Sequence, residues 1–105
     1  MLPYRTAALI VVFLIALSVT LSACETAPPV QEMSDARQAI AVAREADVVD
    51  LAAIELQEAE RFLKRAEQSL SQREYDAARD AAMQASERAK KALRMAEAER
   101  ESLFQ

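Results

Sequence analysis

The chain has 105 residues, contains no histidine, glycine or tryptophan, and carries a formal net charge of −4 with a single cysteine. A chain of this size builds one small domain with little room for an enclosed active site. One cysteine excludes an internal disulfide, and the acidic balance argues against nucleic acid as the natural partner. Ala, Glu, Arg, Lys and Leu dominate after residue 24, which predicts long helices and an all-α fold.

The first 23 residues have the composition of a secretory signal. Residues 1–5 include one basic residue, Arg5, and Ala7 to Leu17 is an uninterrupted apolar run. A membrane-spanning helix needs about 20 apolar residues, a length that this run reaches only if its polar neighbours up to Ser22 face hydrocarbon. We therefore expect residues 1–23 to be a cleaved signal peptide that is helical before cleavage. The alternative is an uncleaved helical anchor.

The boundary of this leader is the stretch Leu21-Ser22-Ala23-Cys24. It resembles the lipobox of bacterial lipoproteins. The resemblance implies that the signal peptidase recognises Leu21, Ser22 and Ala23, and that Cys24 receives a diacylglycerol and fatty acids such as palmitate. Two or more acyl chains would hold the protein durably, at about 0.8 kcal/mol for each buried CH₂. The next residue is Glu25 rather than Asp, which by the same resemblance favours the periplasmic face of the outer membrane over the inner membrane.

Residues 24–33 are predicted to be the lipidated cysteine and a tether. The pair Pro28-Pro29 is incompatible with the interior of a regular helix. Counted from Glu25 to Glu32, the tether would hold the folded part up to about 26 Å from the bilayer.

The alanine-rich remainder, residues 34–105, is predicted to be one helical domain. Ser34 is the expected N-cap of a first helix over residues 34–46, in which apolar residues form a narrow stripe. This stripe consists of Met33, Ala36, Ile40 and Ala43.

A second helix over residues 51–71, capped by Asp50, and a third over residues 74–104 carry apolar seams at heptad spacing. The first of these seams alternates alanine with leucine, and the second is almost all alanine. Antiparallel pairing about Gln72-Arg73 sets large residues against small ones, as in Leu63 against Ala82 and Leu56 against Ala89. This complementarity predicts an antiparallel hairpin. Phe62 and Leu51 widen the first seam and predict contact with another helix. The alternative is one continuous rod, because no glycine or proline interrupts residues 71–76.

Two resemblances follow from these helices. Phe62, Ala66, the turn segment Arg73–Ala78 and Ala85 make the hairpin similar to a tetratricopeptide repeat. Solenoids of such repeats need about three units, so we expect no superhelical peptide groove.

The wider likeness takes in most of the chain after Cys24. The proline tether, Asp35-Ala36-Arg37, Glu55–Ala59 and Glu74–Ala78 resemble an uncharacterised family of alanine-rich helical domains in Gram-negative envelope lipoproteins. That family has no assigned activity, so the resemblance implies a fold and a compartment only.

Two charged clusters have the spacing of candidate sites. Four cations, Arg88, Lys90, Lys91 and Arg94, fall within seven residues. We expect a solvated helix face with a Glu87–Lys91 pair, rather than a site for anionic lipid. Carboxylates at Glu55 and Glu58, and at Glu97 and Glu101, have the spacing of a metal or acid–base pair, but the chain offers neither a histidine nor an obvious pocket. We therefore expect no catalytic residue, metal, cofactor or small-molecule substrate.

The last helix is longer than its partner and should overhang beyond Leu93 by up to a dozen residues. This overhang carries Met95, Ala96, Leu103 and Phe104. Leu103 and Phe104 either fray or bind a partner, which would be a second copy or another envelope protein.

These features together predict a non-enzymatic scaffold or adaptor at the outer membrane. The alternatives are a structural oligomer whose helices form a coiled coil between chains, as in murein lipoprotein, and a membrane protein with an uncleaved leader.

Overall fold

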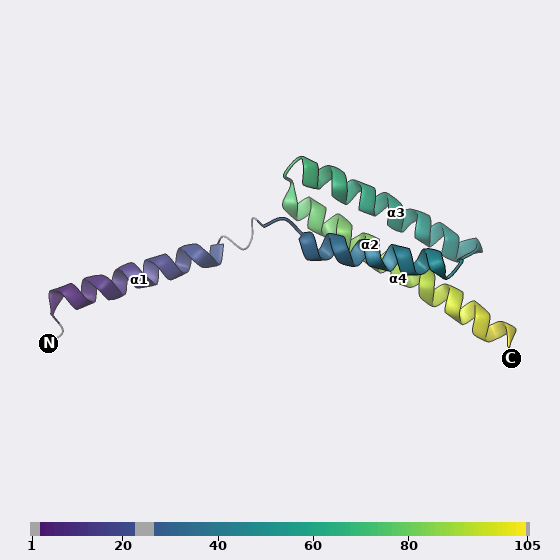
Figure 1. Cartoon of the computed structure of the whole chain (residues 1–105), viewed down its shortest axis with the longest axis horizontal. Helices are drawn as coiled ribbons and strands as arrows, with labels where there is room; N and C mark the ends of the chain where they lie inside the picture. The colour runs from purple at the N-terminus through teal and green to yellow at the C-terminus, as the bar shows by residue number, and fades with distance from the viewer. Residues whose placement is uncertain (1–2, 23–26, 105) are drawn as a thin grey trace.

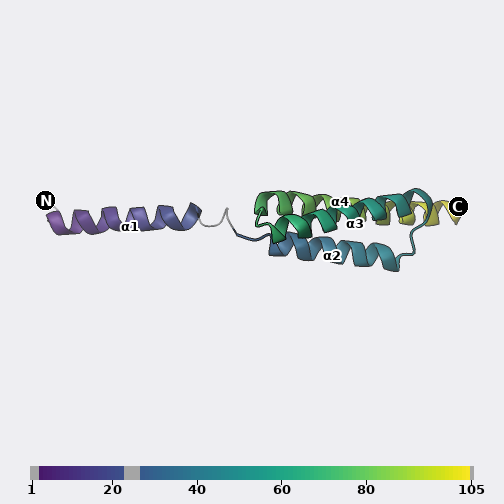
Figure 2. The same ribbon diagram turned by 90° about the horizontal axis from the view of Figure 1, so that it is seen from above.

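The computed structural model describes residues 3–22 and 27–104, and every regular element in these ranges is a helix. The helices are α1 (Tyr4–Ser22), α2 (Val30–Glu45), α3 (Asp50–Ser71) and α4 (Tyr75–Leu103). The all-α prediction is confirmed, and so is the hairpin, because α3 and α4 pack closely along each other. Helix α2 lies against this pair, mainly against α4, and runs in the same direction as α4 (Figures 1 and 2).

Helix α1 lies away from the other three helices in both views (Figures 1 and 2). Its large apolar side chains from Leu9 to Leu17 are exposed. Among the described residues, no helix combines the length and the apolar character that a membrane span requires.

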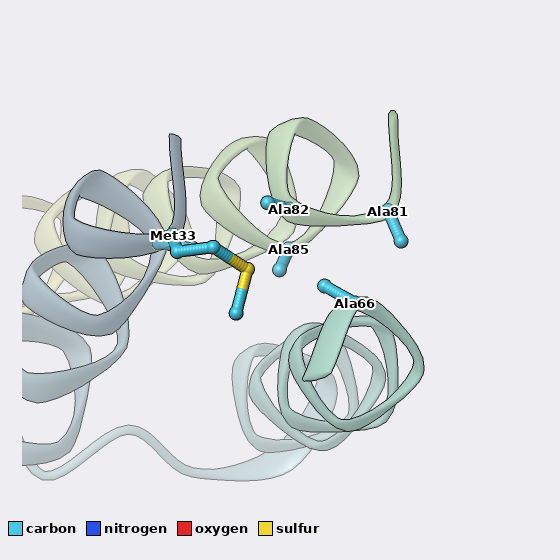
Figure 3. Close-up of a cluster of buried hydrophobic side chains, with 6 residues drawn as sticks. Met33, Ala66, Ala81, Ala82 and Ala85 are labelled. Carbon is cyan, nitrogen blue, oxygen red and sulfur yellow. The ribbon is translucent and has the colours of Figure 1, made fainter. Parts of the chain in front are cut away.

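The core of the bundle is made mostly of alanine. In Figure 3, the Met33 side chain of α2 extends into the space between Ala66 of α3 and the alanines of α4. Leu63 packs against both core clusters, and Leu56 packs against the cluster that contains Ala89. Large residues of α3 therefore face small residues of α4, as predicted. The methyl side chains let the helices approach closely without leaving voids.

Helix α2 begins at Val30, four residues before the predicted start, so Ser34 is not the N-cap. Pro29 occupies that position, and its carbonyl accepts a hydrogen bond from the Met33 N–H at 3.0 Å. Proline is compatible with a helix start, where its missing N–H has no partner to lose. The Pro29 side chain is fully buried, so the second proline of the predicted tether belongs to the folded bundle.

The turn between α3 and α4 forms without glycine. Arg73 adopts the left-handed conformation, with φ of 60°. Its N–H bonds the Leu70 carbonyl at 3.0 Å, and the Glu74 N–H bonds the Ser69 carbonyl at 2.9 Å. This pair of bonds is the Schellman motif that ends helices. It reverses the chain direction at Arg73, so α3 and α4 form a hairpin and not the continuous rod that was the alternative.

The predicted cap at Asp50 is wrong. Asp50 is the first residue of α3, with φ of 54°, and Val49 precedes it as an N-cap without a side-chain bond.

Candidate docking surface

The candidate functional surface lies at the end of the bundle remote from α1 (Figure 1). Here the loop between α2 and α3 meets the C-terminal part of α4, and two shallow hollows share Val49 and Glu99. Leu51 and Met95 line one hollow, and Leu103 lines the other. We call the following residues the distal surface: Val49, Leu51, Ile54, Met95, Leu103 and Phe104.

Most of these apolar side chains face solvent. Leu51 is 67% exposed, Leu103 79% and Phe104 91%. Leu51, which was expected to contact another helix, lines a hollow together with Met95 and Ala98 of α4, although most of its side chain is exposed. Phe62, its companion in that prediction, does pack against the core. Large exposed apolar side chains gathered in one region are typical of interaction surfaces.

The α2–α3 loop is attached to α4 over much of the predicted overhang. An Arg100 guanidinium N–H donates to the Ala46 carbonyl. Ala96 is buried and Met95 is half-buried. The prediction that α4 overhangs its neighbours beyond Leu93 is therefore wrong for the residues up to Arg100. The α2–α3 loop lies against this part of α4.

Carboxylates lie beside the apolar residues of the distal surface. Asp47, Asp50 and Glu99 line the two hollows, and no ion pair joins these three to another residue in the described part of the chain. The only cation lining the hollows is Arg100, whose guanidinium bonds the Ala46 carbonyl. The two hollows therefore combine apolar side chains with three carboxylates and one cation.

Three of the charged residues singled out in the sequence, Glu55, Arg88 and Lys91, form an ion-pair cluster between α3 and α4. Arg88 lies 3.0 Å and Lys91 2.9 Å from the Glu55 carboxylate, which is 15% exposed. The hydrogen bond from Lys91 and then that from Arg88 lower the pKa of Glu55. Lys91 therefore bonds a carboxylate of α3. The spacing along one helix had instead predicted that Lys91 pairs with Glu87 of α4.

The remaining members of these two sets are separate from that cluster. Glu58 pairs with Arg61 at 3.1 Å. Lys90 lines a hollow between α2 and α4, and Arg94, Glu97 and Glu101 are exposed. Within residues 3–22 and 27–104, no three or more His, Cys, Asp or Glu residues are arranged to hold a metal ion.

Arg79 organises the opposite end of the bundle. Its guanidinium donates to the Ala27 carbonyl at 3.1 Å, lies 3.4 Å from Glu32 and 3.2 Å from Asp76. Arg79 therefore fixes the segment before α2 to the first turns of α4. Helix geometry places Leu103 about 36 Å further along α4, at 1.5 Å per residue.

The predicted lipidation site is next to this attached segment in sequence. Leu21 and Ser22 belong to α1, whereas Ala23 and Cys24 lie outside the described residues. Ala27 is three positions after Cys24, a chain length of at most about 11 Å.

Sequence reasoning missed Arg79, Asp47 and Glu99. No local pattern marks these residues, because the residues that they meet lie about 50 positions away in the sequence: Arg79 bonds Ala27, and Asp47 and Glu99 line the same hollow.

The comparisons with known proteins identify a family but no activity. The profile of a domain of unknown function (DUF4398) matches residues 31–103, which is more than half of the chain and takes in α3, α4 and nearly all of α2. No curated protein and no solved structure matches the chain. The protein, a bundle in which α2 lies against an α3–α4 hairpin, belongs to the DUF4398 family.

Proposed function

We propose that the protein is a non-enzymatic adaptor of the bacterial cell envelope. In this proposal, acyl chains on Cys24 anchor it to the periplasmic face of the outer membrane, and the distal surface binds a partner protein. The signal-like leader and the sequence Leu21-Ser22-Ala23-Cys24 support the anchor. Glu25 supports the outer rather than the inner membrane.

The separation of the two ends of the bundle carries the adaptor proposal. Arg79 holds Ala27, three positions after Cys24, at one end, whereas the exposed apolar side chains of the distal surface lie at the other. An anchor and a docking surface at opposite ends of a helical bundle would present a partner at a fixed distance from the bilayer.

The packing of the seams disfavours the structural coiled coil between chains. Ala59 of α3 and Ala89 of α4 are fully buried within one chain, so their seams are not available to a second copy. An oligomer would have to use another surface.

The proposal assigns no catalytic residue. Glu55, the carboxylate held between two cations, has a lowered pKa and therefore carries no proton to donate at neutral pH. A general acid needs the opposite shift.

The anchor is tested by the mass of the protein recovered from membranes, beside a Cys24→Ala form. We expect loss of residues 1–23 and added acyl mass in the parent, and neither change in the variant. An intact, unacylated parent would refute the anchor and establish the uncleaved leader. Separation of inner and outer membranes, with Glu25→Asp as the comparison, tests the compartment.

The docking role is tested by proteins that co-purify with the anchored chain. Leu103→Ser combined with Phe104→Ser should remove the partner. Val30→Ser combined with Met83→Ser is the matched control, because it also replaces two exposed apolar side chains, away from the distal surface. If both double variants retain the same co-purifying proteins, the distal surface is not the docking site.

A further inference from the structure

We infer that the partner segment bound by the distal surface is a basic amphipathic helix. This inference rests on the adaptor role proposed above and adds the chemistry of the partner. It follows from the shape, the apolar character and the charge of one region of the bundle.

The apolar component comes from the two hollows on either side of Val49 and Glu99. Leu51 and Leu103 are mostly exposed at their margins. Two adjacent hollows with apolar walls suit side chains that project from one face of a helix, the arrangement by which amphipathic helices dock in grooves.

The charge component comes from Asp47, Asp50 and Glu99. All three line the hollows, and none forms an ion pair with another residue of the described ranges. Lys and Arg beside the apolar face of a docked helix would supply the missing opposite charges, and such complementarity selects one partner over others.

The same charges argue against two other occupants. A second copy that docked through the same surface would bring the same three carboxylates to the interface, and the chain carries a net charge of −4, so like charges would face each other. An anionic lipid surface would be repelled for the same reason. A helix with positive charges beside its apolar face meets no such repulsion.

The test measures the binding of defined peptides to the whole protein. The membrane-recovered chain is placed in nanodiscs of zwitterionic lipid, and the anisotropy of a labelled helical peptide is measured, with empty nanodiscs subtracted. The first peptide has leucine on one face and lysine on the other. The second replaces lysine with glutamate, and the third keeps the composition of the first but scatters the leucines. We expect the first peptide to bind at least tenfold more tightly than the other two.

Two sets of variants locate the binding site. Leu51→Ser combined with Leu103→Ser should weaken binding of the first peptide at least tenfold. Asp47→Asn, Asp50→Asn and Glu99→Gln together should weaken it at least fivefold and reduce its salt dependence. Asparagine is chosen because it tolerates the left-handed conformation of Asp47 and Asp50.

A matched control removes three carboxylates elsewhere on the bundle. Glu74→Gln, Asp80→Asn and Glu87→Gln replace exposed residues of the α3–α4 turn and of α4, and the affinity should change less than twofold. Circular dichroism of every variant checks that the helices remain.

Four results would overturn the inference. They are equal binding of the acidic or scattered peptide, an equal loss in the control variant, unchanged binding in the leucine variant, and self-association that the leucine variant abolishes. The last result would identify a second copy as the occupant.

The proposed function fails separately. If the peptide binds but the chain is unacylated, the anchor is wrong and the basic helix stands. If a co-purifying protein depends on Leu103 and Phe104 but no basic peptide binds, the adaptor stands and the inferred chemistry is wrong.

Discussion

Replacing Arg73 with glycine should stabilise the α3–α4 hairpin. Arg73 sits in the Schellman motif with φ of 60°, a conformation that costs a residue with a Cβ about 1–2 kcal/mol and costs glycine almost nothing. Glycine also gives the unfolded chain more freedom, which offsets about 0.4–1 kcal/mol of this gain. We expect a net increase of about 0.5–1 kcal/mol in the free energy of unfolding.

Urea unfolding followed by circular dichroism measures this change, and thermal unfolding provides a second measure. A gain of this size corresponds to a rise in Tm of roughly 2–8 °C for a domain of this length. Arg73→Ala is the control, because alanine keeps the Cβ and removes only the long side chain. It should stay within about 0.5 kcal/mol of the parent.

The comparison between glycine and alanine decides the result. If Arg73→Gly is less stable than Arg73→Ala, residue 73 lies in ordinary right-handed helix, where glycine costs about 1 kcal/mol. The hairpin would then be wrong, and α3 and α4 would form one continuous helix.

Three further predictions concern the core, the ion-pair cluster and the segment before α2. Ala66→Leu should destabilise the bundle by about 1–3 kcal/mol in urea unfolding, because Ala66 is fully buried against the alanines of α4. The control, Ala77→Leu at an exposed site of α4, should change the unfolding midpoint little. Equal destabilisation by the two variants would refute the close packing. The lowered pKa of Glu55 means that its stabilising effect is complete above its unfolded pKa, about 4.3, and is lost as pH falls through the lowered folded value. Below about pH 4.3, the free energy of unfolding of Glu55→Gln should therefore fall less with decreasing pH than that of the parent. If both free energies fall equally with pH, the ion pairs of Glu55 do not contribute to stability. Arg79→Gln should speed proteolysis and amide exchange near Ala27 while exchange at the distal surface stays unchanged; an unaltered rate near Ala27 would show that Arg79 does not hold that segment.

The sequence by itself determined the helices, the hairpin and the composition of the core. Alternation of leucine and alanine at heptad spacing places Leu56 and Leu63 on one face of α3, and the pairing with Ala82 and Ala89 follows from the position of the turn. Helix period is a local property of the backbone, and it can be counted along the chain. The prediction failed at helix ends. Ser34 has the side chain of a cap, but buried Pro29 starts α2 instead.

Only the tertiary structure decided which charged and exposed residues act together. Glu55 bonds Arg88 and Lys91, 33 and 36 residues along the chain. The segment before α2 meets Arg79 across 52 residues. The distal surface combines the loop after α2 and the start of α3 with the C-terminal part of α4. Such contacts depend on how three helices cross and on the register in which they pack. These quantities have no counterpart in local spacing, so residues that share no pattern in the sequence become neighbours only when the bundle has formed.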